Sequence, residues 1–288
     1  MKVAIIGGSG KMGRWFASFL LQDGKKVVIT GRNEEKLLDA KKQLRVETAS
    51  NAEAVKSADV VLLSVPISEF ESVVKQVGPY THPGQVIADI TSIKAHPVEI
   101  MHKYIKGSIL GIHPMFGPGA SDITNRNFVL TPTNNDERAL AQKTRGYLEA
   151  RGARVTMMSP HEHDEMMTII LGLSHFIAIV SADTLVNLGR LKQADAISGS
   201  TYKVLLTLAG SVISEDPEFY ASVQTSLPGI AEVERLFQEK SRAWANLVQA
   251  KNNQELVKRM NTLKNRLEKD YPDFGKAYKN MYRIVEGL

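Results

Sequence analysis

The chain has 288 residues, a formal net charge of +5 and no cysteine. Its hydrophobic share of 43% and charged share of 23% are those of a globular protein, which excludes disordered and fibrous classes, and its length suits two domains. The absence of cysteine excludes disulfides, a thiolate catalyst and cysteine-ligated zinc, so we expect a protein of the reducing cytoplasm. The basic residues are scattered, which argues against a nucleic-acid partner.

Neither a membrane span nor a signal peptide is expected. No uninterrupted apolar run reaches the roughly 18 residues of a bilayer span. The nearest run, residues 166–180, contains Ser174 and His175. Residues 1–13 pass from a short apolar stretch straight into glycines instead of a cleavage site, so we expect translation to begin at the first strand and no membrane partner.

Up to about Pro160, short β-branched runs alternate with helical stretches at the spacing of βαβ units. Eight runs are predicted to be strands: Val3–Ile6, Val27–Thr30, Arg45–Thr48, Val60–Val65, Val86–Asp89, Ile109–Ile112, Phe128–Thr131 and Arg154–Met157. The segments between them are predicted to be helices, including Asn33–Lys41, Ser68–Val77 and Asp136–Arg151. The alternation predicts an α/β fold in which residues 1–160 form a Rossmann-like domain with a doubly wound parallel sheet.

After Pro160 every segment has helical periodicity, which predicts an all-helical domain over residues 161–288. Its predicted helices are Glu162–Gly189, Gln193–Ile213, Ile230–Ala250 and Asn253–Lys269, with breaks at Pro217, Pro228 and Pro272. The first helix is apolar almost all round, as in a helix buried among others, for example inside a dimer. The first two helices hold more apolar surface than a lone helical domain easily buries, so we expect a homodimer.

The first predicted strand leads directly into Gly8-Ser9-Gly10-Lys11-Met12-Gly13 and then into a helix from Trp15 to Leu21. In a dinucleotide-binding loop the first glycine permits a tight turn, the second lets a pyrophosphate approach, and the third lets helix and strand pack closely. The helix N-terminus then offers N–H groups to the phosphates. The alternative is a βα turn that is merely tight.

The second predicted strand decides which dinucleotide is expected. NAD enzymes usually place a carboxylate at the end of this strand, whereas here it is followed by Gly31-Arg32-Asn33 and then Glu34. The guanidinium of Arg32 suits a 2′-phosphate, so we predict that Arg32 and Asn33 bind NADP, with NAD also possible. The alternative is that Arg32 is a solvated cap of the next helix. Ser64, at the end of the fourth strand, is a further cofactor candidate.

Two later strand ends carry candidate catalytic residues. Carboxyl ends of parallel strands bind ligands, so the hydroxyl of Ser92 and the imidazole of His113 are expected to face one cleft. A histidine followed by a proline and glycines is expected to be more exposed than a core histidine, and its pKa near neutrality allows it to take a proton. The alternative is that His113 is a hydrogen-bonded loop residue. No metal is expected.

These residues also carry a family resemblance. The order of GxGxxG, Asp-x-x-Ser-x-Lys, Gly-x-His-Pro-Met-x-Gly-Pro, Leu-Thr-Pro (130–132) and Met-Ser-Pro-x-x-His-Asp (158–164) resembles the prephenate dehydrogenases, notably the compact archaeal forms, over the first 190 residues. The resemblance implies oxidative decarboxylation of prephenate to 4-hydroxyphenylpyruvate, or of arogenate to tyrosine, in tyrosine biosynthesis. It also implies that His113 takes the proton of the ring hydroxyl, that Ser92 orients His113, and that relatives pair through the helical domain.

The resemblance extends to the substrate side with departures. It places His175 facing the substrate, although a lone histidine on an apolar helix is also typical of a satisfied core residue. Bacterial members carry a second histidine one turn earlier, near Gly172, and an arginine for a substrate carboxylate near Thr207. Lys203, one turn before Thr207, is a candidate replacement as a point charge. The chain ends without the regulatory module that some relatives append, so we expect no tyrosine feedback through such a module.

Two other classes stay open. A deazaflavin-dependent NADP oxidoreductase shares the Gly-Gly-x-Gly opening and the arginine after the second strand, but lacks the His-Pro-Met-x-Gly-Pro block and the long helical tail. A nucleotide-sensing protein would keep the Rossmann domain without catalysis, against which the intact His113 and Ser92 argue. The sequence does not distinguish prephenate from arogenate. For a histidine base, it predicts a rate that rises with pH through the titration of a histidine, whose unperturbed pKa is about 6.5, and this prediction concerns the rising limb and not its midpoint.

Overall fold

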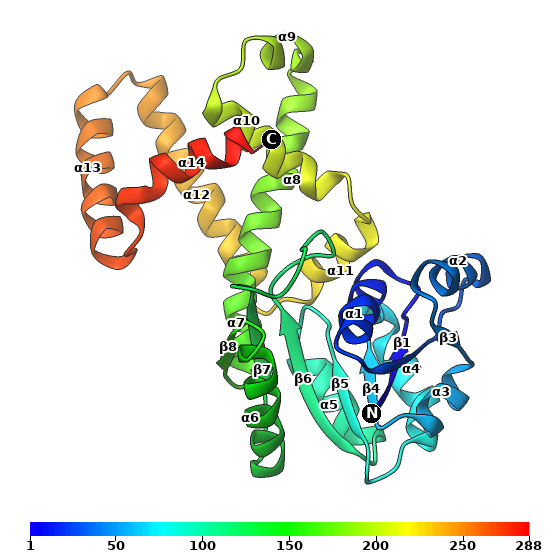
Figure 1. Ribbon diagram of the computed structural model, residues 1–288. Coiled ribbons are helices and arrows are strands. Elements are labelled where there is room, and N and C mark those ends of the chain that lie inside the picture. The colour runs from blue at the N-terminus through cyan, green and yellow to red at the C-terminus, as the bar shows by residue number, and fades with distance from the viewer. Residues whose placement is uncertain (288) are drawn as a thin grey trace. The chain divides into compact units, whose positions relative to one another are not determined.

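The computed structural model describes residues 1–287, and its internal contacts divide the chain into two units, Met1–Met167 and Thr168 onward. The first unit is α/β and the second is helical (Figure 1), which confirms the predicted fold class. Helix α7 (Pro160–Met167) follows the predicted domain boundary at residue 160, and its contacts group it with the first unit.

The first unit is built on an eight-stranded sheet with the order β3-β2-β1-β4-β5-β6-β7-β8. The strands are β1 (Lys2–Ile6), β2 (Lys26–Ile29), β3 (Glu47–Thr48), β4 (Val60–Leu63), β5 (Val86–Asp89), β6 (Ser108–Pro114), β7 (Asn127–Thr131) and β8 (Arg154–Met157), so all eight predicted strands are present. The prediction of a wholly parallel sheet is wrong at one place, because β7 is antiparallel to β6. Parallel neighbours need a crossover connection, and residues 115–126 between these strands contain no helix.

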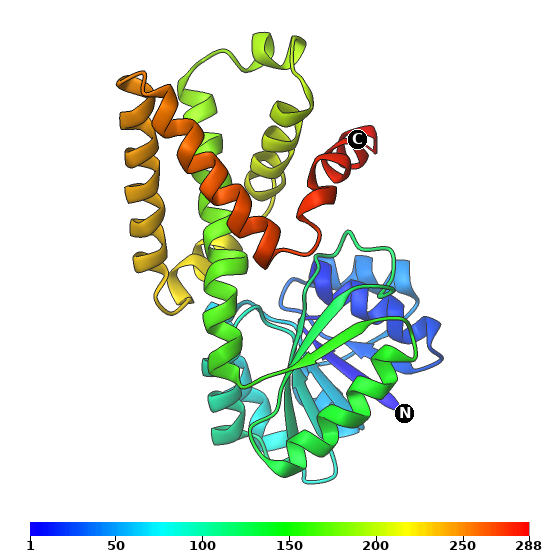
Figure 2. The same ribbon diagram turned by 90° about the vertical axis from the view of Figure 1, so that its left-hand side faces the viewer.

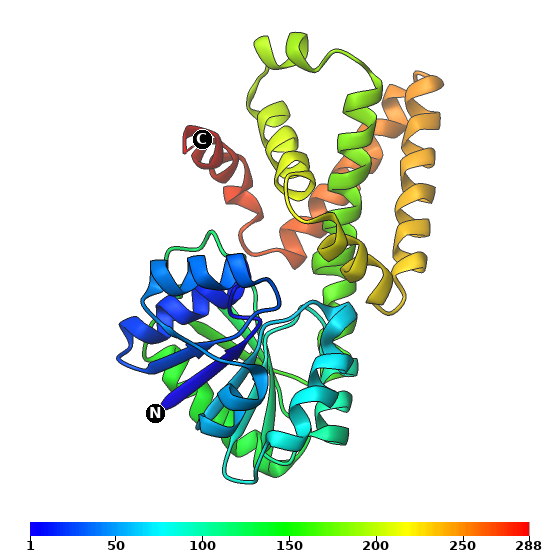
Figure 3. The ribbon, with the colours of Figure 1, turned by 90° about the vertical axis from the view of Figure 1, so that its right-hand side faces the viewer.

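Helices cover both faces of this sheet (Figures 2 and 3). They are α1 (Lys11–Gln22), α2 (Glu34–Leu44), α3 (Asn51–Ser57), α4 (Ile67–Val77), α5 (Ala95–Tyr104) and α6 (Asn135–Glu149). In β1, Val3 and Ile5 belong to the core beneath α1, α2 and α6, whereas Ala4 and Ile6 belong to the core beneath α3, α4 and α5. Successive side chains of a strand point to opposite faces, so a central strand covered on both sides is apolar throughout.

The strand order reverses beside β1, which pairs with β2 on one side and with β4 on the other. In doubly wound sheets the crevice at the carboxyl ends of the strands flanking such a point is where ligands bind. Ile6 at the end of β1 lies opposite Leu63 at the end of β4. The segments that follow these two strands, beginning at Gly7 and Ser64, are therefore brought together by the topology.

The second unit is helical throughout its described residues. After a π-helical segment (Thr168–Leu173) come α8 (Ser174–Asn187), α9 (Leu191–Ala196), α10 (Ser200–Ile213), α11 (Pro217–Ser226), α12 (Ile230–Gln249), α13 (Asn253–Asp270) and α14 (Ala277–Glu286). Helix α10 packs against both α8 and α14, and α12 and α13 form a hairpin (Figure 2). The predicted helix Gln193–Ile213 is divided between α9 and α10, and the predicted break at Pro217 is present between α10 and α11, with Pro217 in the first turn of α11.

The helical stretch Pro160–Asn187 differs from expectation in its burial. Its 28 residues include an 18-residue window with a mean hydropathy of 1.9, so by length and composition alone this stretch could cross a membrane. Only 11% of that window is buried within the chain, and Ala178 is the only buried residue of α8. The expected burial among other helices is therefore not reached within one chain, and burial inside a dimer stays a prediction.

Candidate active site

The glycine loop joins β1 to α1 in the conformation of a nucleotide cradle. Gly7 has a φ of +81°, in the region that favours glycine, so the sharp turn belongs to Gly7. The predicted role of Gly8 in the turn is therefore corrected. A Cβ on Gly8 would lie 2.6 Å from the Cβ of Ile29, so its task is close packing against β2.

The other two glycines of the motif differ in what surrounds them. A Cβ on Gly13 would lie 2.6 Å from the carbonyl oxygen of Gly7, so only a glycine lets α1 approach the loop this closely. A Cβ on Gly10 would meet nothing within 4 Å except that same oxygen at 3.3 Å, which leaves its outer side open. Gly10 is the N-cap of α1 and no side chain caps the helix. An open backbone at a helix N-terminus is what a pyrophosphate requires, so the residues fit a dinucleotide.

Arg32 and Asn33, which follow β2, make different contacts. Arg32 lies on the surface with its guanidinium 3.0 Å from the carboxylate of Glu69 on α4. The side chain of Asn33 accepts a hydrogen bond of 2.8 Å from the backbone N–H of Lys36, so Asn33, and not Arg32, is the helix cap. A Cβ on Gly31 would press on the hydroxyl of Ser9, so the loop itself disfavours a side chain at this position.

The two predicted serines, Ser64 and Ser92, differ in their hydrogen bonds. Ser64 follows β4, and its backbone N–H donates to the carbonyl of Ile6 at 2.9 Å, which places it beside the glycine loop. Ser92 lies half-buried in the bend between β5 and α5. Its hydroxyl makes no hydrogen bond within residues 1–287, so the expectation that Ser92 orients His113 stays a prediction.

His113 lies within β6 and is 5% exposed. The expectation of an exposed residue after the strand is wrong, because β6 extends through Pro114 and pairs His113 with Val129 of β7. Nδ1 of His113 lies 2.8 Å from Nε2 of His163. Nε2 of His113 has no partner within residues 1–287, and it is not among the fully buried unpartnered atoms of that range, so it keeps access to solvent.

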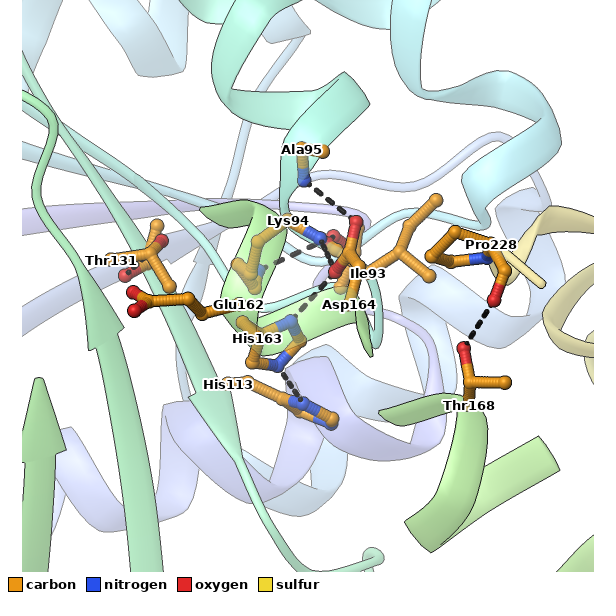
Figure 4. Close-up of polar contacts among 12 residues, drawn as sticks. Ile93, Lys94, Ala95, His113, Thr131, Glu162, His163, Asp164, Thr168 and Pro228 are labelled. Carbon is orange, nitrogen blue, oxygen red and sulfur yellow. Dashed lines mark hydrogen bonds and ion pairs between the residues drawn. The ribbon is translucent and has the colours of Figure 1, made fainter. Parts of the chain in front are cut away.

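His163 and Asp164 on α7 continue this contact into the domain (Figure 4). Nδ1 of His163 lies 2.7 Å from the Asp164 carboxylate. That carboxylate also accepts hydrogen bonds from the backbone N–H groups of Lys94 at 2.7 Å and Ala95 at 2.9 Å. Asp164 therefore caps the N-terminus of α5 from a distant part of the chain.

A buried ion pair lies behind the two histidines. Lys94 and Asp89 are fully buried, and the Lys94 ammonium contacts the Asp89 carboxylate, which also accepts a hydrogen bond of 2.6 Å from Thr91. Burial lowers the pKa of Lys94, while the contact with Asp89 acts in the opposite direction. A buried pair of this kind is costly to break, because removing one partner leaves an uncompensated charge.

Both histidines are disfavoured as cations. Burial, followed by the charge of Lys94 and the proximity of His163, holds the pKa of His113 well below 6.5. Burial also lowers the pKa of His163, although the Asp164 carboxylate opposes the shift. The rising limb predicted for a histidine base is thus expected below pH 6.5. His113 is neutral at neutral pH, which is the state a general base needs.

The helical unit holds the two predicted substrate residues on neighbouring helices. His175 on α8 is half-buried, packs edge-on against Tyr220, and has an Nδ1 atom that is buried without a partner. The prediction of a satisfied core histidine is therefore not met. Lys203 on α10 is exposed. Their roles toward a substrate stay predictions.

The sequence motifs contain His163, Asp164, Asp89 and Lys94, but the motifs alone assign no site role to these residues. The signal was present in the Asp-x-x-Ser-x-Lys and Met-Ser-Pro-x-x-His-Asp blocks. The sequence does not show that these two blocks contact each other in the folded protein. The carboxylate of Asp164 meets the backbone of Lys94, 70 positions earlier in the chain.

The sheet order, the glycine loop and the separate helical unit define a nucleotide-binding protein of the Rossmann class. Two family models agree: "Prephenate dehydrogenase, nucleotide-binding domain" matches residues 16–157, and "Prephenate dehydrogenase, dimerization domain" matches residues 159–262. The chain belongs to the prephenate dehydrogenase family. The match of the second model to the helical unit separates it from the deazaflavin class, which lacks this tail.

Known proteins give the same assignment. A probable arogenate/prephenate dehydrogenase of Methanocaldococcus jannaschii is 34% identical over 90% of this chain and 59% of its own length. The T-protein of Enterobacter agglomerans is 31% identical over 86% of this chain and 62% of its own length. The chain thus spans about three fifths of these relatives. A crystal structure of prephenate dehydrogenase from A. aeolicus shares the fold, with a TM-score of 0.76 and 23% identity over 94% of this chain and 98% of that one.

Proposed function

We propose that the protein catalyses the nicotinamide-dependent oxidative decarboxylation of prephenate to 4-hydroxyphenylpyruvate, or of arogenate to tyrosine. The observation that carries this proposal is the neutral, solvent-accessible Nε2 of His113, held at the carboxyl edge of the sheet that bears the glycine loop. The names of the relatives, arogenate/prephenate dehydrogenase and prephenate dehydrogenase, support the substrate class. The physiological setting would be tyrosine biosynthesis in a reducing cytoplasm.

For this reaction the protein needs only to hold the substrate and cofactor in the correct position and to supply one general base. Nε2 of His113 takes the proton of the substrate hydroxyl as the hydride leaves the same carbon. A bound nicotinamide would supply the acceptor for that hydride. The dienone that develops loses carbon dioxide and becomes aromatic. His175 and Lys203 are our candidates for contacts to the substrate, and Ser92 for a further contact near His113.

We propose NADP as the preferred cofactor, with Gly8, Ser9, Gly10, Lys11, Met12 and Gly13 around the pyrophosphate and Ser64 near the nicotinamide ribose. The preference rests on Arg32 and on the lack of a carboxylate at Gly31. The ion pair of Arg32 with Glu69 does not argue against it, because both side chains are exposed and surface pairs contribute little. The A. aeolicus enzyme was solved with NAD+, so NAD is the alternative.

We also propose a homodimer formed through the helical unit. The support is the apolar surface of the stretch Pro160–Asn187, which the chain itself leaves mostly uncovered, together with a family model described as a dimerization domain. A second copy would cover that surface in water. A membrane would be the competing cover, and the oligomeric state of the purified protein distinguishes the two.

The test of the proposed activity is direct. The purified protein is mixed with prephenate or arogenate and with NADP or NAD, and reduced-nicotinamide absorbance is followed together with carbon dioxide release. We expect stoichiometric formation of both products with at least one substrate. Absence of turnover with all four combinations would overturn the proposal.

A further inference from the structure

Asp164, His163 and His113 are joined by two hydrogen bonds. These hydrogen bonds involve every ring nitrogen of the two histidines except Nε2 of His113. An ionised carboxylate only accepts hydrogen bonds, so the Asp164 carboxylate requires a hydrogen on Nδ1 of His163. Because the pKa of His163 is lowered, the ring is neutral at neutral pH and its Nε2 is bare. A bare Nε2 in turn requires a hydrogen on Nδ1 of His113. The remaining nitrogen, Nε2 of His113, is then bare as well.

This arrangement imposes the tautomer that the reaction needs. A neutral histidine side chain in water favours the form with its hydrogen on Nε2, which could not accept a proton there. The hydrogen bond at the other ring nitrogen decides the tautomer in a protein. His163 is completely buried and touches both neighbours, so it is the residue that sets the state of His113.

We propose that His163 is the positioning residue of this site: it holds His113 with a bare Nε2 and receives the Nδ1 proton of His113 when Nε2 takes the proton of the substrate. The proposal rests on the proposed function. In this step the substrate O–H bond and the His113 Nδ1–H bond break, and the His113 Nε2–H and His163 Nε2–H bonds form. His113 ends neutral, and the positive charge lies on His163.

The surrounding charges favour this end state. The groups that face the two rings are Lys94, Asp89 and Asp164, from the β5–α5 segment and α7. The positive charge of Lys94 acts against a cation on either ring, whereas of the two rings the Asp164 carboxylate directly contacts that of His163. A cation on His163 is therefore better compensated than a cation on His113.

Two substitutions of His163 distinguish its hydrogen-bonding role from a role in packing alone. In His163→Gln, the side-chain amide reaches about as far as Nε2 of histidine, so its oxygen can still accept the Nδ1–H of His113 but cannot take up the proton. In His163→Phe, the ring volume is kept and the acceptor is lost. Asp164 is unsuitable for this purpose, because it also caps α5. The matched control is His161→Gln, an exposed histidine on the same helix.

The first measurement uses the free protein and needs no substrate. Nitrogen-15 spectra of histidine-labelled protein report which ring nitrogen carries the hydrogen, with the His113 signals assigned by their loss in His113→Asn. We expect hydrogen on Nδ1 of His113 in the wild type, His163→Gln and His161→Gln, and on Nε2 in His163→Phe. Hydrogen on Nε2 of His113 in the wild type would overturn the proposal even if turnover is found.

The second measurement is kinetic and tests the proton transfer. We expect His163→Phe to lower kcat by roughly 10²- to 10⁴-fold, the range for a base that is lost or held in the wrong tautomer, with cofactor affinity unchanged. His163→Gln should recover part of this loss, and His161→Gln should match the wild type. A kcat within about twofold of wild type in His163→Phe contradicts the role, on the scale of that same range.

Solvent isotope effects distinguish positioning alone from transfer to His163. Single turnovers of cofactor-loaded protein are measured in mixtures of light and heavy water. A curved dependence on deuterium content in the wild type, from two moving protons, and a linear one in His163→Gln support the transfer. A linear dependence in the wild type overturns it. If His163→Phe fails to fold, the comparison of wild type with His163→Gln decides.

Discussion

The two units of this chain bury their apolar residues in very different ways. The α/β unit has two continuous cores, one on each face of its sheet, and includes fully buried aromatic residues such as Phe70 and Phe128. In the helical unit, α12, α13 and α14 have no buried residue at all within one chain. Hydrophobic stabilisation follows the area removed from water. The first unit therefore buries its own apolar residues, whereas the second leaves much of its apolar surface exposed within a single chain, as the proposed dimer would require.

The largest effect is expected from removing the base, which tests whether the chemistry lies in the first unit. Replacing His113 by Asn should lower turnover by roughly 10²- to 10⁴-fold, because the amide cannot take a proton. Calorimetric titration should show unchanged cofactor affinity, since the glycine loop lies on other strands. Ser92→Ala is the control and should cost less, because its hydroxyl makes no hydrogen bond in residues 1–287. Retention of more than about a tenth of the activity in His113→Asn would contradict the role of His113.

The next largest effect concerns the core of the first unit. Phe70→Ala should lower the free energy of unfolding by about 3–5 kcal/mol, because it removes a fully buried ring and leaves a cavity. Urea denaturation should show this loss equally at low and high protein concentration. Leu38→Ala, at a 55% exposed position on α2, should change it by less than about 0.5 kcal/mol. A concentration-dependent loss for Phe70→Ala would show that the first unit also depends on a partner.

A substitution that alters the preference for NADP is expected to have a smaller effect, and this effect also concerns only the first unit. Arg32→Ala should weaken NADP binding by roughly ten- to a hundredfold and leave NAD binding unchanged, because only the 2′-phosphate meets the guanidinium. Glu69→Gln is the complementary change. It removes the carboxylate that pairs with Arg32, so it should strengthen NADP binding. Equal affinities for NAD and NADP in the wild type would refute the assignment of NADP.

The dependence of the second unit on a cover can be tested at Val186, which is 63% exposed on α8. Light scattering of the wild type should give twice the chain mass of 31.8 kDa. Val186→Glu should weaken association by about tenfold or more, because it places a charge on an apolar surface. The thermal midpoint of the wild type should also rise with protein concentration. A monomeric mass at micromolar concentration would count against the dimer.

The smallest expected effect is a shift of the pH dependence of kcat/KM to lower pH. The pKa of His113 is lowered, so kcat/KM should stay level at and above pH 6.5 and fall only at lower pH, as the base becomes protonated. Stability should begin to decline below 6.5, since the unfolded chain binds this proton first. The profile is compared with that of Lys94→Met, which removes the nearby positive charge and should move the midpoint upward. A wild-type midpoint at or above 6.5 would contradict the burial argument.

The sequence predicted the elements well and the convergence of distant residues poorly. Runs such as Val86–Asp89 have a local pattern, and all eight strands were found from it. The direction of β7 was missed, because a strand's pattern does not encode its direction. The glycine loop and His113 were found because each lies within one short motif. The neighbour of His113 was not, because His163 reaches it only through tertiary folding across 50 positions.

The capping of α5 by Asp164 has a consequence for how the protein is made. All eight strands, the glycine loop and His113 are complete once the chain has passed residue 157. At that stage, however, the N-terminus of α5 has no cap from α7 and His113 has no partner to fix its tautomer. If the proposed function and the proposed role of His163 hold, a nascent or truncated molecule of that length should bind the cofactor but lack turnover. Docking of α7 would then couple the completion of folding to the onset of activity.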